Sequence, residues 1–77
     1  AIKVYPNPCK DVLHFEIPNS DASATIRLLD IAGRLMEEQI INSGTTAIFD
    51  VDGYSPGLYY YQVITNDRTQ VGKLVVE

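Results

Sequence analysis

The sequence contains no tryptophan, one histidine and one cysteine among its 77 residues. Because a disulfide needs two thiols, Cys9 cannot form one within the chain, and the fold must rest on apolar packing. One histidine and one cysteine also leave few groups that could converge for acid–base or nucleophilic chemistry. A Cys9–His14 pair would need an oxyanion pocket as well, which so short a chain has little room to build. The sequence therefore does not indicate an enzyme, and it predicts no cofactor.

Positive charge is sparse: six basic residues stand against ten acidic ones, and the formal net charge is -4. The basic residues are scattered singly, without the basic stripe that phosphate contacts require, so nucleic acid is not an expected partner. No apolar run reaches the length of a transmembrane helix, and the first ten residues lack the layout of a signal peptide. We expect either a cytosolic protein or a piece of a longer exported one.

The hydrophobic content of 45% and the charged content of 21% are typical of a folded chain. At this length we expect a single domain over residues 1–77 with a thin core. Apolar side chains alternate with polar ones along most of the chain, which is typical of strands with one buried face. The alternation predicts three buried sets: Leu13, Phe15 and Ile17; Ala24, Ile26 and Leu28; and Ala47, Phe49 and Val51.

Further strands are expected over residues 34–41, 58–65 and 69–76, and the last two of these are rich in β-branched and aromatic side chains. Turn residues separate the strands. We expect Gly33 to follow a type I turn as a glycine bulge and residues 42–44 to repeat that hairpin. We also expect a type II turn at Pro56 and Gly57 and a two-residue hairpin loop at residues 66–67. Together these signals predict an all-β fold, a small immunoglobulin-like antiparallel β-sandwich of about seven strands.

Two prolines flank Asn7 between the first two strands. Proline has no N–H to give to a sheet, and Pro8 also keeps Asn7 out of the helical region. We expect Pro6, Asn7 and Pro8 to end an edge strand, to form a stiff corner and to block further pairing, with the next strand starting near Val12.

Two features of the sequence suggest a binding site, one for a metal ion and one for a sugar. Asp50 and Asp52 precede Gly53 as in calcium loops, but tyrosines stand where the remaining oxygen ligands should be, so two solvated carboxylates beside a turn are favoured. A row of exposed tyrosine rings could hold a polysaccharide, so a carbohydrate-binding or adhesive module stays an alternative. A purely structural spacer between domains is the other alternative.

Alternation, however, places Tyr59 and Tyr61 on the inner face with Val63 and leaves Tyr60 as the ring expected on show. Tyr59 resembles a corner tyrosine, which packs inward while its hydroxyl caps a loop.

Four ordered pieces of the chain, "YPNP" with "LHFEI", "LLDIAGRLM", "FDVDGYSPGLYYYQV" and "VGKLVVE", resemble the type A C-terminal sorting domain of the type IX (Por) secretion system of Bacteroidetes. The resemblance covers nearly the whole chain. It implies a module excised from a larger secreted protein, covalently joined to an N-terminal cargo domain. It also implies an outer-membrane translocon and a sortase-like peptidase as partners, and a cargo that is secreted or cell-surface after passing through the periplasm.

The family's motifs fall on residues that also have structural reasons to be there, because Gly33 and Gly57 suit turns and Leu74 suits a core. Lys73 is the exception, since packing does not require a charge in an apolar terminal strand. Protection of a sheet edge against unwanted strand pairing is the alternative reason for a lysine there. We expect its side chain to point to solvent, and residues 58–77 to present the surface that the translocon reads, by strand addition at an edge. By this resemblance the candidate residues fall into four motifs: the first is Pro6, Asn7 and Pro8, the second is Asp30, Gly33 and Arg34, the third is Gly57 and Tyr59, and the last is Lys73, Leu74, Val75 and Val76.

Overall fold

The computed structural model describes residues 2–17, 23–42, 46–66 and 68–77, and these contain seven strands and no helix. The strands are β1 (Lys3–Tyr5), β2 (Val12–Glu16), β3 (Ala24–Leu29), β4 (Leu35–Ile41), β5 (Thr46–Asp50), β6 (Gly57–Ile64) and β7 (Thr69–Val76). All strand ladders are antiparallel. The all-β fold predicted from the sequence is confirmed.

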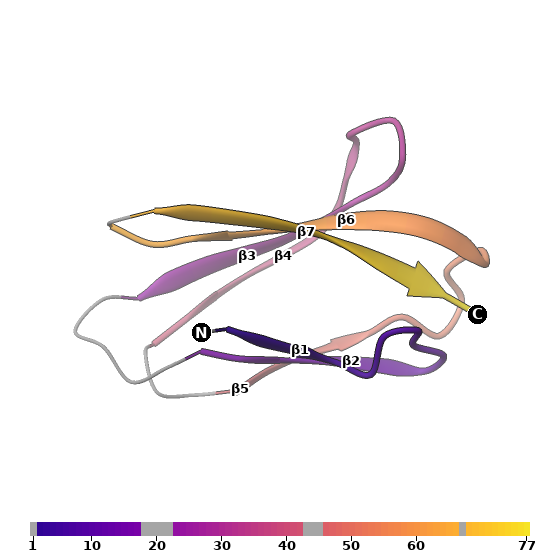
Figure 1. The fold of residues 1–77 in the computed structure, drawn as a ribbon, viewed down its shortest axis with the longest axis horizontal. Coiled ribbons are helices and arrows are strands. Elements are labelled where there is room, and N and C mark those ends of the chain that lie inside the picture. The colour runs from indigo at the N-terminus through magenta and orange to yellow at the C-terminus, as the bar shows by residue number, and fades with distance from the viewer. Residues whose placement is uncertain (1, 18–22, 43–45, 67) are drawn as a thin grey trace.

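The strands form two sheets that lie face to face as two layers (Figure 1). One sheet has the order β1-β2-β5 and the other has the order β4-β3-β6-β7. The chain passes from one sheet to the other after β2, after β4 and after β5. This arrangement of two packed antiparallel sheets with crossing connections is the immunoglobulin-like sandwich that the turn spacing predicted.

The core lies between the two layers, and its strand residues come from alternate positions of β2, β3, β5, β6 and β7. All nine members of the three predicted buried sets are buried. The Phe15 ring contacts Phe49 of its own sheet and Tyr61 of the other sheet edge to face, with centroid distances of 5.4 and 5.3 Å. Both ring pairs have the T-shaped geometry that aromatic side chains prefer, and together they join the two layers.

Gly33 has the predicted left-handed conformation in the turn between β3 and β4, with a φ of 85°. Its N–H donates to the carbonyl of Asp30 at 2.9 Å, and the register of the two strands shifts between Leu28 and Leu29. The prediction of a type I turn followed by a glycine bulge is therefore confirmed.

Two other turn predictions are wrong. The expected hairpin at residues 42–44 does not form, because β4 and β5 belong to different sheets; residues 43–45 themselves lie outside the described part of the chain. The hydrogen-bonded turn before β6 is not at Pro56 but at Val51 to Tyr54, where the Tyr54 N–H donates to the Val51 carbonyl at 3.0 Å. Gly53 takes the positive φ in that turn. Gly57 does have the predicted positive φ, 148°, but it starts β6 and is not part of a type II turn.

The predicted hairpin between β6 and β7 is confirmed by a register of eight residue pairs, from Gly57 opposite Val76 to Ile64 opposite Thr69. The Thr65 N–H donates to the Arg68 carbonyl at 2.9 Å and closes the loop. Asp67, which was expected in this loop, lies outside the described residues.

Candidate recognition site

Asn7 lies between two prolines, and its side chain forms hydrogen bonds with β7. Asn7 Nδ2 donates to the Lys73 carbonyl at 3.2 Å, and Asn7 Oδ1 accepts from the Val75 N–H at 3.1 Å. The carboxamide has one donor and one acceptor side, as a peptide group does. Asn7 therefore pairs with the outer edge of β7 through its side chain, where the flanking prolines have no N–H to offer.

The main chain continues this pairing at Cys9. The Cys9 N–H donates to the Val75 carbonyl at 2.9 Å, and the Glu77 N–H donates to the Cys9 carbonyl at 2.8 Å. Cys9 and Val76 form a parallel bridge. We call residues 6–9 the proline corner. The prediction that Pro6, Asn7 and Pro8 end an edge strand is confirmed, because β1 lies at the edge of its sheet and ends at Tyr5. The expectation that they block further pairing is wrong, because the proline corner covers the C-terminal half of the β7 edge in the other sheet.

The last motif alternates between the two faces of β7. Leu74 and Val76 are buried in the core, whereas Lys73 and Val75 are exposed on the outer face. The structure thus confirms the prediction that the Lys73 side chain points to solvent. Leu74 and Val76 hold the strand in place, and Lys73 and Val75 are the members of this motif whose side chains a partner could contact.

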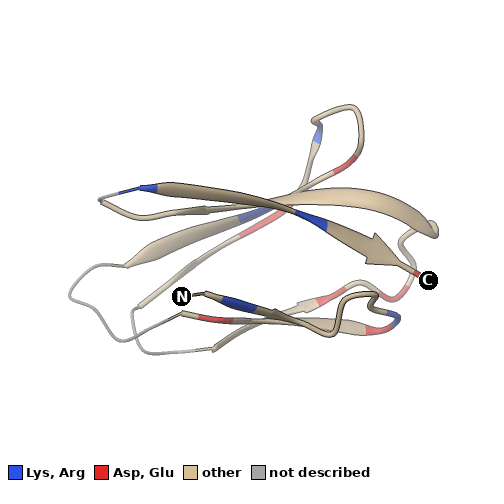
Figure 2. Ribbon diagram, in the orientation of Figure 1, with Lys and Arg blue, Asp and Glu red and all other residues tan. Residues whose placement is uncertain are grey.

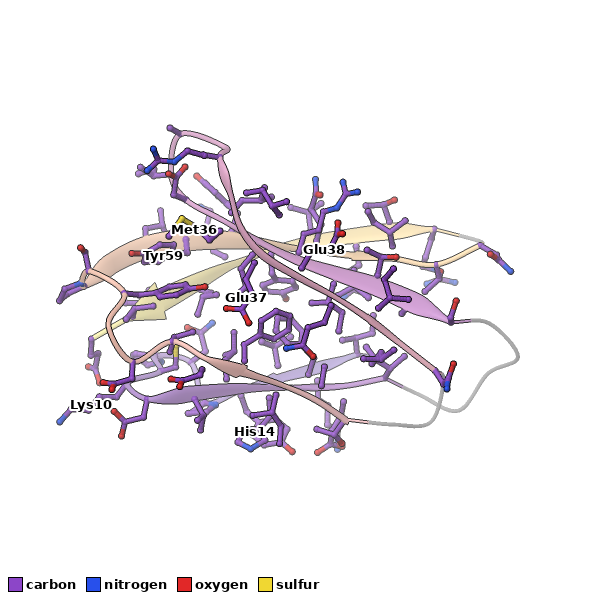
Figure 3. All side chains as sticks on the ribbon, turned by 180° about the vertical axis from the view of Figure 1, so that it is seen from behind. Lys10, His14, Met36, Glu37, Glu38 and Tyr59 are labelled. Carbon is purple, nitrogen blue, oxygen red and sulfur yellow. The ribbon has the colours of Figure 1, made fainter. Side chains whose placement is uncertain are left out.

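The third motif lies opposite the last one at the start of β6. Gly57 is paired with Val76 and Tyr59 with Leu74. Tyr59 is buried, and its hydroxyl donates to the Ser55 carbonyl at 2.8 Å, four residues upstream (Figure 3). This is the geometry predicted for a corner tyrosine, which fixes the chain as it enters the strand. The structure therefore brings the first, third and last motifs together at one end of β7.

The second motif, Asp30 with Gly33 and Arg34, caps the β3–β4 hairpin, which stands out from the body of the sandwich (Figure 1). Asp30 Oδ1 accepts from the backbone N–H groups of Ala32 at 3.0 Å and Arg34 at 2.8 Å. Arg34 Nε forms an ion pair with Asp30 Oδ2 at 3.0 Å. The hydrogen bond from the Arg34 N–H, together with the Arg34 charge, lowers the pKa of Asp30. This motif is a self-contained turn, apart from the other three.

The sequence analysis missed the role of Gly72, which lies within the strand expected over residues 69–76. Tyr61 lies opposite Gly72, and a Cβ atom on Gly72 would lie 2.3 Å from Cζ and Oη of the Tyr61 ring. Gly72 therefore leaves the space into which the ring leans. A glycine inside a strand pattern is a signal for such a close approach.

A second missed feature closes the side of the sandwich between β4 and β5. The Tyr54 hydroxyl donates to Glu37 Oε1 at 3.0 Å, and Gln39 Nε2 donates to the Ile48 carbonyl at 2.8 Å. Glu37 projects toward the other sheet (Figure 3). Burial and the hydrogen bond to Glu37 raise the pKa of Tyr54. The sequence places Glu37 and Gln39 within an expected strand, but it gives no signal that identifies their partners outside that strand's sheet.

The residues considered for catalysis and binding do not assemble such sites. Cys9 is buried and burial raises the pKa of its thiol, while the His14 ring stacks on Tyr5 at 5.0 Å. Tyr60 is half-buried, so the expectation that it is the ring on show is wrong; Tyr5 is 39% exposed. Among the described residues no group of His, Cys, Asp and Glu could hold a metal ion, and no helix could span a membrane.

Fold and site together define a class: a small immunoglobulin-like module in which short motifs near its two ends interlock. Comparison with known families agrees, because the model of the secretion system C-terminal sorting domain matches residues 3–77. The chain belongs to this family, whose members are sorting signals of the type IX secretion system and not catalytic domains.

Two curated relatives are Bacteroidetes proteins that carry a similar segment. The ulvan lyase NLR42 of Nonlabens ulvanivorans is 30% identical over 77 residues, which are 99% of this chain and 14% of the lyase. The thiol protease/hemagglutinin PrtT of Porphyromonas gingivalis is 50% identical over 35 residues, which are 46% of this chain and 4% of that protein. The chain therefore spans only a small part of the relatives that it matches.

Proposed function

We propose that this chain is the C-terminal secretion signal of a larger protein and directs that protein through the outer-membrane translocon to the cell surface. The cargo is joined covalently on the N-terminal side of the domain, and residues 1–77 form the whole sorting module. The cargo crosses the periplasm before the translocon recognises the domain. A sortase-like peptidase then removes the domain upstream of Ile2.

One observation carries the proposal most directly. Three of the four family motifs converge on β7: Asn7 binds its edge, and Gly57 and Tyr59 pair with it. Scaffold requirements explain Leu74 and Val76, which are buried, but they do not explain an exposed Lys73. A surface that a partner reads would account for the exposed members of the set.

The test is a fusion with an inner-membrane signal peptide, a folded reporter and this domain at the C-terminus, expressed in a Bacteroidetes host that has the secretion system. We expect the reporter at the cell surface. Retention of the folded fusion in the periplasm would contradict the proposal.

The same fusion in a host strain without the translocon provides the control. We expect the reporter to stay in the periplasm of that strain, because the domain acts through the translocon. Surface delivery in its absence would show that the domain uses another route.

A further inference from the structure

The outer surface of the β4-β3-β6-β7 sheet is more apolar than a solvent-exposed sheet face needs to be. The strand registers align Leu35, Leu29, Tyr60 and Lys73 in one row across all four strands. The next row continues with Leu58 opposite Val75, and Gln62 lies opposite Val71 on the other side. We call these residues the docking face. Its aliphatic members include Val71, Leu35 and Val75, which are 59%, 51% and 40% exposed. Contiguous apolar surface of this kind marks an interaction site.

Lys73 is the charged member of the docking face and lies at the β7 end of the first row. It lies opposite Tyr60 on β6, and Val71 and Val75 flank it on the same side of β7. Arg27 on the same sheet is neutralised by Glu38, whose Oε2 lies 2.6 Å from Arg27 Nε. The ion pairs found among the described residues do not include Lys73. A partner that covers the apolar row must therefore meet an unpaired ammonium group.

The edge of β7 is a poorer candidate for the same contact. Asn7 and Cys9 already bind the Lys73 carbonyl and the Val75 N–H and carbonyl, and the Cys9 carbonyl binds the Glu77 N–H. A partner strand could reach this stretch only after displacing the proline corner. The side chains of Lys73 and Val75 need no such displacement, because they point away from the core.

We propose that the docking face binds an apolar protein surface that carries a carboxylate opposite Lys73. This inference rests on the proposed function and names the chemistry of the partner: an acidic, apolar patch on the secretion machinery. Covering Lys73 without an opposite charge would leave a desolvated cation, which is costly. An anionic lipid surface fits less well, since such surfaces select clusters of four to eight basic residues and this face has one unpaired cation. Figure 2 shows how sparse charge is on this sheet.

The experiment uses the full fusion, with signal peptide, reporter and domain, and compares variants at Lys73. We expect Lys73→Arg to be exported like the wild type, Lys73→Gln less well and Lys73→Glu least, about tenfold below the wild type because like charges would face each other. Lys10→Glu is the matched control: it makes the same change of charge at an exposed lysine in the loop between β1 and β2, outside the docking face (Figure 3). We expect its export to equal that of the wild type.

The outcomes separate the two proposals. If the wild-type fusion is not exported, the proposed function fails. If the wild-type fusion is exported and the Lys73→Glu and Lys10→Glu fusions are exported equally well, the docking-face proposal is wrong and the proposed function stands. If Lys73→Arg lowers export as much as Lys73→Glu does, a pair between the Lys73 charge and a carboxylate of the partner is contradicted. Equal unfolding midpoints of the isolated variants are expected, and a lower midpoint for Lys73→Glu alone would assign its effect to folding and overturn the role of Lys73.

Two further arms test the apolar part and the kind of partner. Val75→Ser is expected to lower export severalfold, whereas Ile48→Ser, at a 55% exposed position on the other sheet, is not; equal effects would overturn the assignment of the face.

Vesicles of phosphatidylglycerol are the probe for a lipid surface. We expect wild type and Lys73→Glu to bind them equally poorly, and binding that depends on Lys73 would overturn the choice of a protein partner.

Discussion

At the scale of single residues, Asn7 links the two ends of the chain, because it binds β7 at positions 66 and 68 residues away. We predict that Asn7→Ala lowers the free energy of unfolding by about 1 to 2 kcal/mol, since two backbone groups of β7 lose their partner. Urea unfolding of the isolated domain measures this. Asn7→Asp is the informative companion, because a carboxylate keeps the acceptor for Val75 but cannot donate to Lys73; a midpoint unchanged in both variants would contradict the pairing.

Asp30 gives the residue-scale prediction for pH. Its pKa is lowered in the folded state, chiefly by the Arg34 N–H, so its contribution to stability is fully present above the ordinary value of 3.8 and is lost as the pH falls through the lower folded value. We expect acidification from about pH 5 to about pH 3 to destabilise the wild type more than Asp30→Asn, which cannot titrate there. Parallel urea midpoints of the two proteins over this range would show that Asp30 does not contribute.

At the scale of strands, the β6–β7 hairpin depends on the absence of one side chain. We predict that Gly72→Ala destabilises the domain by about 1 to 3 kcal/mol, because its Cβ would overlap the Tyr61 ring, which packs on Phe15. The measurement is thermal or urea unfolding. In a Tyr61→Ala background the same change should cost little, and equal costs in both backgrounds would place the origin of the effect elsewhere.

Strands and their buried faces could be predicted from the sequence because alternation is a local property. Leu13 and Phe15 are buried for the reason that their spacing indicated, and Gly33 bends the chain as its turn requires. Pairing is not local. The turn residues after β4 suggested a hairpin, but β5 binds β2 instead, so that Ala47 and Phe49 face the common core.

In the candidate site, too, local features could be predicted from the sequence and long-range contacts could not. Lys73 could be recognised from its position as a charge in an apolar strand, and the structure places it on the outer face. The contacts of Asn7 with β7 could not be predicted, because no local pattern signals that a side chain replaces a backbone partner in another sheet. The roles of Tyr54 and Glu37 were missed for the same reason.

At the scale of the whole molecule, the two sheets are closed on both open sides by different means. The proline corner bridges the side of β1 and β7, and the side chains of Gln39 and Tyr54 bridge the side of β4 and β5. Because so small a domain buries little apolar surface, these bridges help to hold the two layers in register. The closed sandwich holds the docking face as one continuous surface, and we expect recognition to require the folded domain.

The central claim is that the domain is a sorting signal that acts from the C-terminus. The most direct measurement is the ratio of surface to periplasmic reporter for two fusions of identical parts, one with the domain at the C-terminus and one with it between the signal peptide and the reporter. Our account predicts surface delivery for the first fusion and periplasmic retention for the second. Equal delivery of both, or retention of both with the domain folded, would contradict it.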